Sequence, residues 1–321
     1  IGSEIMDDGM SALFDNLIAS TFFVVDPASR LFWLSILSSV VLAILVLRLQ
    51  GRTINLRFLR RVFLSKRYWL NPSTIIDLKW FVANCGVKAI LATLFVSAQL
   101  AVTMGVALVL QREFGTASTS TLPWFTIAVV YSLVFFVAED LSRFLLHVAM
   151  HKIPLLWRVH TVHHSATTLT PLTLHRVHPV EICLYYARGI LVFGLISGVF
   201  VYQFGGQLTA LDILGVDALG FLFNMVGANL RHSNIWLSFG RFEKQFISPA
   251  QHQLHHSSEV IHRDTNFGTC LAIWDRWLGS WQPAGTQKQK LTFGLAPRKT
   301  ECQRESSEYS VSPFLVVKGV N

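Results

Sequence analysis

The stretch WFTIAVVYSLVFFVAEDLSRFLLHVAMH, residues 124–151, decides the fold. It begins with a mainly apolar run that has no charged residue before Glu139, and about 20 helical residues of that kind cross a bilayer. Its second half contains Glu139 and then two histidines, His147 and His151. The run predicts a transmembrane helix over Trp124–Leu146 whose last turns leave the hydrocarbon. The two histidines then share one helix face, because positions i and i+4 lie on successive turns.

The composition places the whole chain in a membrane. Of its 321 residues, 52% are apolar and only 14% are charged, whereas soluble domains carry about 25% charged residues. The net charge of +8 would suggest nucleic acid as a partner of a soluble protein. Here the basic residues flank apolar runs, as the positive-inside rule describes, so we expect no nucleic acid.

The cysteines are far apart and form no CxxC pair, which predicts reduced thiols; they are Cys85, Cys183, Cys270 and Cys302.

Four further stretches are apolar enough to cross a bilayer, namely Leu31–Leu49, Val87–Leu110, Ile182–Phe204 and Leu208–Leu230. Only three residues separate the last two, which predicts a helical hairpin. We therefore expect an all-α integral membrane protein with about four to five transmembrane helices and a cytoplasmic, histidine-rich helical cap. The predicted parts are an N-terminal segment (1–30), three membrane helices with a basic loop at 50–86 (31–146), a histidine-box catalytic region that includes the membrane hairpin 182–230 (147–286), and a polar tail (287–321).

Charge predicts the orientation. Basic residues crowd the connection between the first two spans, which should hold it in the cytoplasm; they are Arg48, Arg52, Arg57, Arg60, Arg61, Lys66, Arg67 and Lys79. Counting crossings puts the histidine-rich cap on the same side. The fourth and fifth spans contain Arg188, Asp212 and Asp217, so a shallow insertion of that hairpin stays open.

The histidines carry the strongest functional signal. All 12 lie between His147 and His262. Eight of them form three boxes, HVAMH (147–151), HTVHH (160–164) and HQLHH (252–256). On a helix each box presents imidazoles from successive turns toward one point. Because a structural zinc takes four ligands, this many imidazoles predict two metal ions. Imidazole suits iron, zinc, copper and nickel alike, so spacing alone leaves the metal open.

Other metal chemistries lack their motifs. The sequence has no HExxH, so a zinc protease of that type has no support. Ferritin-like di-iron sites need two ExxH motifs, and only Glu259–His262 has that spacing. His175 and His262 lack box spacing, and we expect them at the surface or behind the ligands. No GxGxxG, flavin or haem-binding motif occurs.

Between Glu139 and Trp281 the chain resembles the fatty acid hydroxylase/sterol desaturase superfamily of histidine-box di-iron oxygenases. The three boxes occur in the order of that family. The elements between and after them are RVHPVE (176–181), RHSN (231–234), DTNFG (264–268) and WDRWLG (274–279). One departure is Val148, where many relatives place arginine; it is not a ligand position, so the ligand assignment is unaffected.

The resemblance implies two iron ions, O2 as the co-substrate, and hydroxylation or desaturation of a lipid, sterol or related hydrophobic substrate. The metal ligands that it implies are His147, His151, His160, His163, His164, His252, His255 and His256, with His178 and His232 added between the boxes. Asp140 would orient a ligand imidazole, with packing or capping as its alternative. Asn266 and Asp275 would steady the last box, with turn-forming and capping roles as theirs.

The substrate should enter from the bilayer, and electrons should arrive in trans from a ferredoxin, a cytochrome b5 or a reductase. A zinc-dependent membrane hydrolase or lyase on the same histidines is the first alternative, because zinc also accepts imidazole. A metal transporter is the second, although transporters place ionisable ligands inside their membrane spans.

Overall fold

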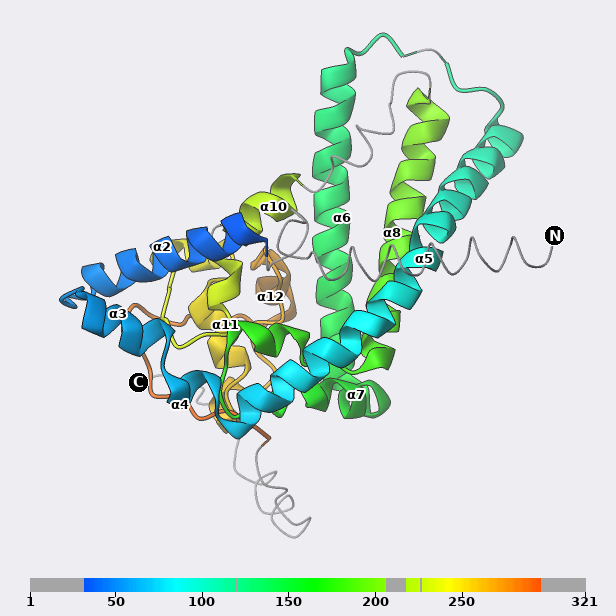
Figure 1. The fold of residues 1–321 in the computed structure, drawn as a ribbon. Coiled ribbons are helices and arrows are strands. Elements are labelled where there is room, and N and C mark those ends of the chain that lie inside the picture. Colours follow the sequence, from blue (N-terminus) through cyan, green and yellow to red (C-terminus); the bar gives the residue numbers. More distant parts are fainter. Residues whose placement is uncertain (1–31, 119, 206–217, 226, 296–321) are drawn as a thin grey trace, which may run out of the picture.

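The computed structural model describes residues 32–118, 120–205, 218–225 and 227–295 (Figure 1). These residues are helical, with no strand beyond two isolated bridges, so the all-α prediction is confirmed. The α-helices are α2 (Trp33–Leu49), α3 (Leu56–Phe63), α4 (Lys66–Trp69), α5 (Pro72–Phe114), α6 (Trp124–Lys152), α7 (Pro154–His164), α8 (Pro179–Phe204), α10 (Ala218–Met225), α11 (Pro249–His255) and α12 (Ile273–Leu278). The short 3-10 turns are η1 (Pro171–His175), η3 (Ala228–Leu230), η4 (Gly240–Lys244) and η5 (Val260–His262).

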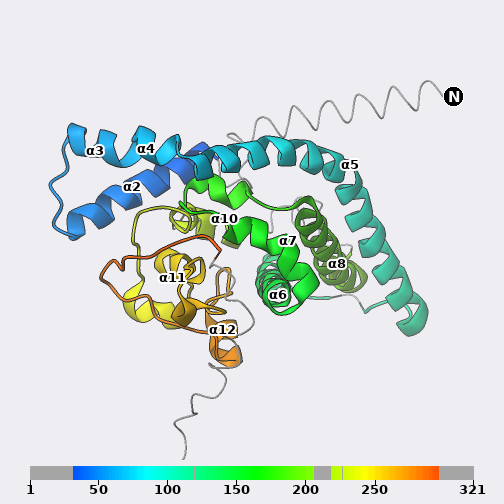
Figure 2. The same ribbon diagram turned by 90° about the horizontal axis from the view of Figure 1, so that it is seen from below.

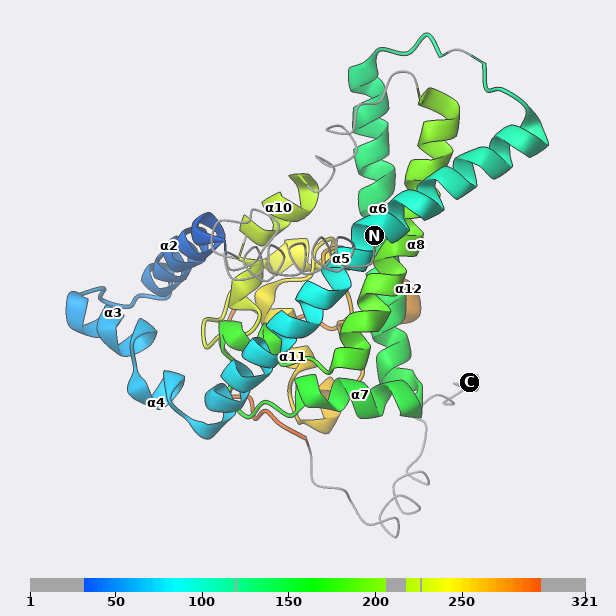
Figure 3. The ribbon, with the colours of Figure 1, turned by 45° about the vertical axis from the view of Figure 1, so that its right-hand side comes forward.

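Three helices, α5, α6 and α8, are long and apolar enough to cross a membrane, and they contain three of the predicted spans. Helices α6 and α8 run side by side, and α5 crosses α8 obliquely (Figures 1 and 3). Two glycines allow this crossing. A Cβ atom at Gly194 would lie 2.5 Å from Cβ of Val102, and one at Gly198 would lie 2.5 Å from Cβ of Val106. The backbones of α5 and α8 therefore meet where neither glycine carries a side chain.

The first and fifth predicted spans look different. Helix α2 is 17 residues long and runs across the direction of α6 and α8 (Figures 1 and 2). Of Leu208–Leu230, residues 208–217 lie outside the described residues. The remainder is the short α10, followed by Gly227 at φ 97° and then η3. Because a left-handed residue ends a helix, the fifth span does not continue as one helix to Leu230.

The first half of α5 packs against the segment around η1, and together with α7 and residues 227–295 these parts form the cap at the ends of α6 and α8. Asp77 lies in the second turn of α5. Its carboxylate forms an ion pair with Nη1 of Arg176 at 3.2 Å and accepts a hydrogen bond from Oγ1 of Thr173 at 2.7 Å. About two turns further on, Nδ2 of Asn84 donates to the carbonyl oxygens of His175 and Val177. The expected basic loop 50–86 is thus mostly helix, made of α3, α4 and the start of α5.

The remaining cap residues, 227–295, wrap around α11 (Figure 1). Ser258 N–H donates to the carbonyl of Thr292 at 2.9 Å, so the first residues of the predicted tail pack against the cap. Cys85, Cys183 and Cys270 are free thiols, as predicted, while Cys302 lies outside the described residues.

Candidate metal centre

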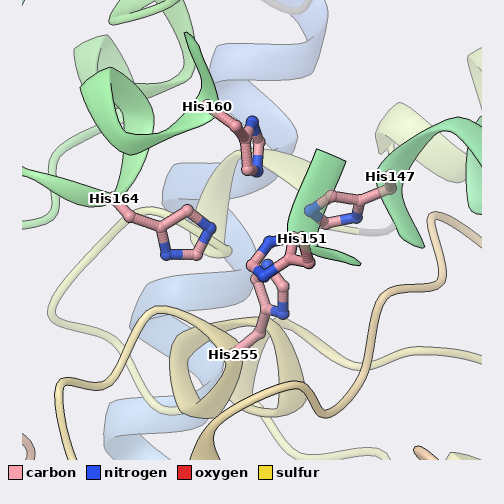
Figure 4. A group of neighbouring side chains, drawn as sticks. All are labelled: His147, His151, His160, His164 and His255. Atoms are coloured by element: carbon pink, nitrogen blue, oxygen red, sulfur yellow. The ribbon is translucent and has the colours of Figure 1, made fainter. Parts of the chain in front are cut away.

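Five histidines from three helices form the first group. His147 and His151 come from α6, His160 and His164 from α7, and His255 from α11, and one ring nitrogen of each lies within 4.8 Å of all the others. Figure 4 shows these five rings turned toward a common space. The group assembles because α6 ends at Lys152 and Pro154 starts α7 almost at once, which folds the second box back against the first.

Two backbone carbonyls orient rings of this group. Nδ1 of His147 lies 2.7 Å from the carbonyl oxygen of Phe267, and Nδ1 of His255 lies 2.7 Å from that of Thr265. A carbonyl oxygen only accepts hydrogen bonds, so both Nδ1 atoms carry the proton. The Nε2 atom of each ring then has the free lone pair that a metal needs.

Two carboxylates stand behind other rings of the group. Nδ1 of His160 lies 3.0 Å from Oε1 of Glu181, which is the last residue of RVHPVE. Nδ1 of His151 lies 3.5 Å from Oδ1 of Asp264, and that carboxylate also accepts a bond of 2.8 Å from Lys152. Carboxylates in this position fix the tautomer of a metal-ligating histidine and raise its basicity.

The inward-facing nitrogens have no protein partner. The Nε2 atoms of His151, His160, His164 and His255 are buried and make no hydrogen bond to any described residue. A buried acceptor without a partner costs free energy, and several converging lone pairs repel one another. A cation in this space would satisfy all of them, so the residues fit a bound metal.

The second group consists of His163 on α7, His232 after η3, and His252 and His256 at α11. The Nε2 atoms of His232, His252 and His256 lie 3.0, 3.1 and 3.2 Å from one another. Nitrogens bound to one ion at 2.0–2.1 Å are about 3.0–3.4 Å apart. This triangle therefore matches the spacing of ligands around a single ion.

The two groups adjoin. Both draw on α7 and α11, and the rings of His164 and His256 stack with centroids 4.5 Å apart. Helix α11 holds its share in place through a capping box, in which Ser248 and Gln251 each bind the backbone of the other, and Pro249 at its first position starts the helix. The geometry therefore suits two neighbouring ions.

Burial keeps these imidazoles neutral. Removal from water lowers the pKa of His160 to about 3 and, together with the neighbouring His160 ring, that of His163 to about 4. Burial and then the adjacent imidazoles place the pKa well below its usual range at His164, His252, His255 and His256. Neutral imidazole is the form that binds a metal.

Nine of the ten histidines predicted as ligands lie in the two groups, and His178 lies in neither. It is the N-cap of α8, where its Nδ1 accepts the N–H of Val180 at 3.2 Å, so the geometry gives its predicted ligand role no support. His175 packs its ring on Phe81. His262, expected at the surface or behind the ligands, is buried with Nδ1 3.9 Å from Oε2 of Glu259.

Asp140 contacts no histidine through the hydrogen bonds of the described structure. Its carboxylate accepts the N–H groups of Cys270 and Leu271 at 2.8 and 3.0 Å and the indole N–H of Trp274 at 2.9 Å. The spacing on α6 placed Asp140 on the face of His147, but the chain opposite that turn offers donors of its own. These hydrogen bonds are closer to the alternative role, packing or capping, than to the predicted orientation of an imidazole.

Asn266 and Asp275 hold the segment that supports the first group. Asp275 accepts the N–H groups of Phe267 and Gly268 at 2.8 and 2.7 Å. Asn266, at φ 54°, exchanges hydrogen bonds with the backbone of Gln282. Both residues therefore contact the first group only indirectly, through the segment in which Phe267 carries the carbonyl facing His147.

Sequence reasoning missed Glu181 and Asp264 as partners of ligand imidazoles. Both stand inside quoted motifs, RVHPVE and DTNFG, so the available signal was an acidic residue within a family element. Nothing in the spacing showed which histidine either one would reach, because each contact joins segments far apart in the chain.

Comparison with known proteins agrees with this geometry. The fatty acid hydroxylase family profile matches residues 132–280, which include every histidine of both groups. An ornithine lipid hydroxylase of Rhizobium tropici is 27% identical over 145 residues, 45% of this chain and 40% of that protein. An alkylglycerol monooxygenase of Danio rerio is 24% identical over 181 residues, 56% of this chain and 36% of that protein.

A very-long-chain aldehyde decarbonylase of Oryza sativa subsp. indica is 41% identical over 71 residues, 22% of this chain and 26% of that protein. The chain thus spans at most 40% of the length of these relatives, and no solved structure matches it. The matched region, residues 132–280, contains the histidine boxes in order and folds into both histidine groups, and it matches the fatty acid hydroxylase superfamily.

Proposed function

We propose that this membrane protein is a non-haem di-iron oxygenase that uses O2 and external electrons to hydroxylate or desaturate a lipid. The observation that carries the proposal is the pair of adjoining histidine groups, which contain five and four imidazoles. Family membership supports iron as the metal, since imidazole alone does not discriminate it from zinc. Iron bound there would supply O2 activation and the removal of hydrogen from an unactivated C–H bond.

The protein's own residues position and shield the metals. Glu181, Asp264 and the carbonyls of Thr265 and Phe267 hold the rings from behind. Phe144, Phe267 and Trp274 form a buried apolar cluster, and the Phe267 ring lies 5.7 Å from that of His147. Such a wall excludes water from one side of the histidines, which protects a reactive site from side reactions.

A lipid substrate is supported by the long apolar helices and by two relatives, an ornithine lipid hydroxylase and an alkylglycerol monooxygenase. Because the first group begins at the last turns of α6, the substrate would reach it from the adjacent leaflet. Electrons would come in trans from a ferredoxin, a cytochrome b5 or a reductase. The active site would lie on the cytoplasmic side, because the basic residues of α3 and α4 favour that side for the connection between the first two apolar stretches.

Anaerobic reconstitution with ferrous iron tests the proposal. We expect two iron ions per chain by metal analysis, a coupled pair in the Mössbauer spectrum, and O2 consumption that depends on added lipid and reductant. Lipid mass spectrometry should then find an added oxygen atom or a new double bond. One tightly bound zinc per chain with no O2 consumption would reject the oxygenase in favour of a zinc hydrolase or lyase. Metal flux across proteoliposomes that His163→Ala abolishes would instead indicate a transporter.

A further inference from the structure

Helix α2 has two unlike faces. Ser35, Ser39 and Ala43 are buried at successive turns; Ser35 contacts Met225 of α10, and Ala43 packs with Leu230 and Ile235. The opposite face is large and apolar. Its side chains are about half exposed or more, at Trp33, Leu37, Val41, Leu45 and Leu49. A helix with small residues on its buried face and large apolar residues on its exposed face is expected to contact lipid or another protein on the exposed face.

The direction of α2 limits what that covering can be. Helices α6 and α8 run along the membrane normal if they cross, and α2 lies across them in both perpendicular views (Figures 1 and 2). Its 17 residues measure about 25 Å at the helical rise of 1.5 Å per residue, short of the roughly 30 Å of hydrocarbon. Helix α2 is therefore oriented to lie within a leaflet.

The segment after α2 carries positive charge that no neighbouring acidic residue in the sequence balances. No acidic residue occurs between positions 32 and 76, where six arginines and lysines follow Arg48 in the last turn of α2. On α3 the side chains of Val62 and Phe63 pack toward the protein, while Arg57, Arg60 and Arg61 are exposed. Exposed leucines accompany them, at Leu56, Leu64 and Leu70. Basic and apolar side chains on one exposed surface are typical of helices that lie in an anionic membrane interface.

We propose that α2 does not cross the bilayer but lies in the plane of one leaflet, with α3 and α4 holding their basic side chains against anionic phospholipid headgroups of that leaflet. Helix α4 leads directly into α5, and Tyr68 binds the carbonyl of Leu169 in the cap. The lipid-bound segment would therefore lie at the same membrane surface as the histidine groups. This inference is independent of the proposed activity.

Depth measurements by spin labelling test the in-plane helix. Single nitroxide labels would replace Leu37, Val41 and Leu45 on α2, with Leu191, Leu195 and Val199 on α8 as the matched series, since all six are about half exposed at the same spacing. The full chain, with native cysteines replaced, would be placed in nanodiscs of phosphatidylcholine and phosphatidylglycerol. Accessibility to O2 and to a water-soluble nickel chelate reports the depth of each label.

We expect depth to change by about 6 Å per step along α8, since four residues rise that far, and to stay constant within a few ångströms along α2. A steady change along α2 equal to that along α8 would mean that α2 crosses the bilayer and would overturn the proposal. Nickel access at all three α2 labels, or dipolar broadening from a second copy, would also overturn it, because the face would then meet water or another protein.

The charge component has its own test with a label at Leu64. Adding phosphatidylglycerol to phosphatidylcholine nanodiscs should lower its access to the nickel chelate several-fold, and R60E/R61E should abolish that response. R112E is the control, because Arg112 is also exposed but lies at the far end of α5 from α3 and α4. A label indifferent to lipid charge, or a basic face that binds an acidic soluble protein in preference to the anionic discs, would refute the assignment to headgroups.

Discussion

Nδ1 of His160 lies 3.0 Å from Oε1 of Glu181, and both side chains are buried. The contact joins the second histidine box to the first turn of α8. It therefore fixes one predicted metal ligand to a helix that is long and apolar enough to cross a membrane.

Glu181→Ala should weaken metal binding by about 10- to 100-fold, the effect of losing the acceptor behind a ligating histidine. Glu181→Gln keeps an acceptor oxygen and should cost less. Chelator competition on the purified protein measures both affinities. Glu259→Gln serves as the control, because Glu259 is 42% exposed and faces His262, which is outside both groups. Equal affinities for all three variants would argue against a supporting role for Glu181.

His252→Ala should reduce the metal content toward one ion per chain and eliminate product, since it removes one corner of the nitrogen triangle with His232 and His256. His175→Ala should leave the metal content unchanged, because His175 lies outside both groups. Metal analysis and product assays on detergent-purified protein compare the two. If both variants kept full metal content, the ligand assignment would be wrong.

Gly198→Val should destabilise the protein by about 1–3 kcal/mol, the usual range for overpacking. A Cβ atom there would lie 2.8 Å from the carbonyl oxygen of Thr103 as well as against Val106. Gly105→Ala on α5 is the control, because nothing lies within 4 Å of its added Cβ and alanine favours a helix over glycine. Thermal unfolding in detergent should separate the variants, and a Gly198→Val protein as stable as wild type would contradict this packing.

Acid should destabilise the metal-free protein. The pKa values of His160 and His163 fall to about 3 and 4 on burial, whereas an unfolded histidine has a pKa of about 6.5. The unfolded chain therefore binds more protons between these values, and stability rises with pH. This contribution should be complete above pH 6.5 and lost as the pH falls toward 3. Unfolding temperatures of the metal-free protein across that range test the sign, and a flat profile would mean that the rings are not desolvated.

Sequence spacing was sufficient to predict the grouping of histidines that lie within one box. HxxxH and HxxHH place their rings on one helix face whatever the rest of the chain does, and all eight box histidines lie in the two groups. Spacing could not identify what lies opposite a helix turn. Asp140 shares a face with His147, yet it binds the backbone at Cys270 and Leu271.

Apolar runs had a similar limit. A run predicts a helix that avoids water, and α5, α6 and α8 confirm this for three stretches. It says nothing about direction, so Leu31–Leu49 was expected to cross while α2 lies across the bundle (Figure 1). Nor does hydropathy locate a break such as Gly227, whose left-handed conformation ends the helical path near Leu230.

The five residues DTNFG, 264–268, touch rings from two different helices. Asp264 and the Phe267 carbonyl face His151 and His147 of α6, and the Thr265 carbonyl faces His255 of α11. The alignment of these three imidazoles is therefore a property of one short loop. Inserting a single residue into it should displace imidazoles of both helices at once, whereas the exposed apolar positions of α6 should accept substitutions that leave these rings in place.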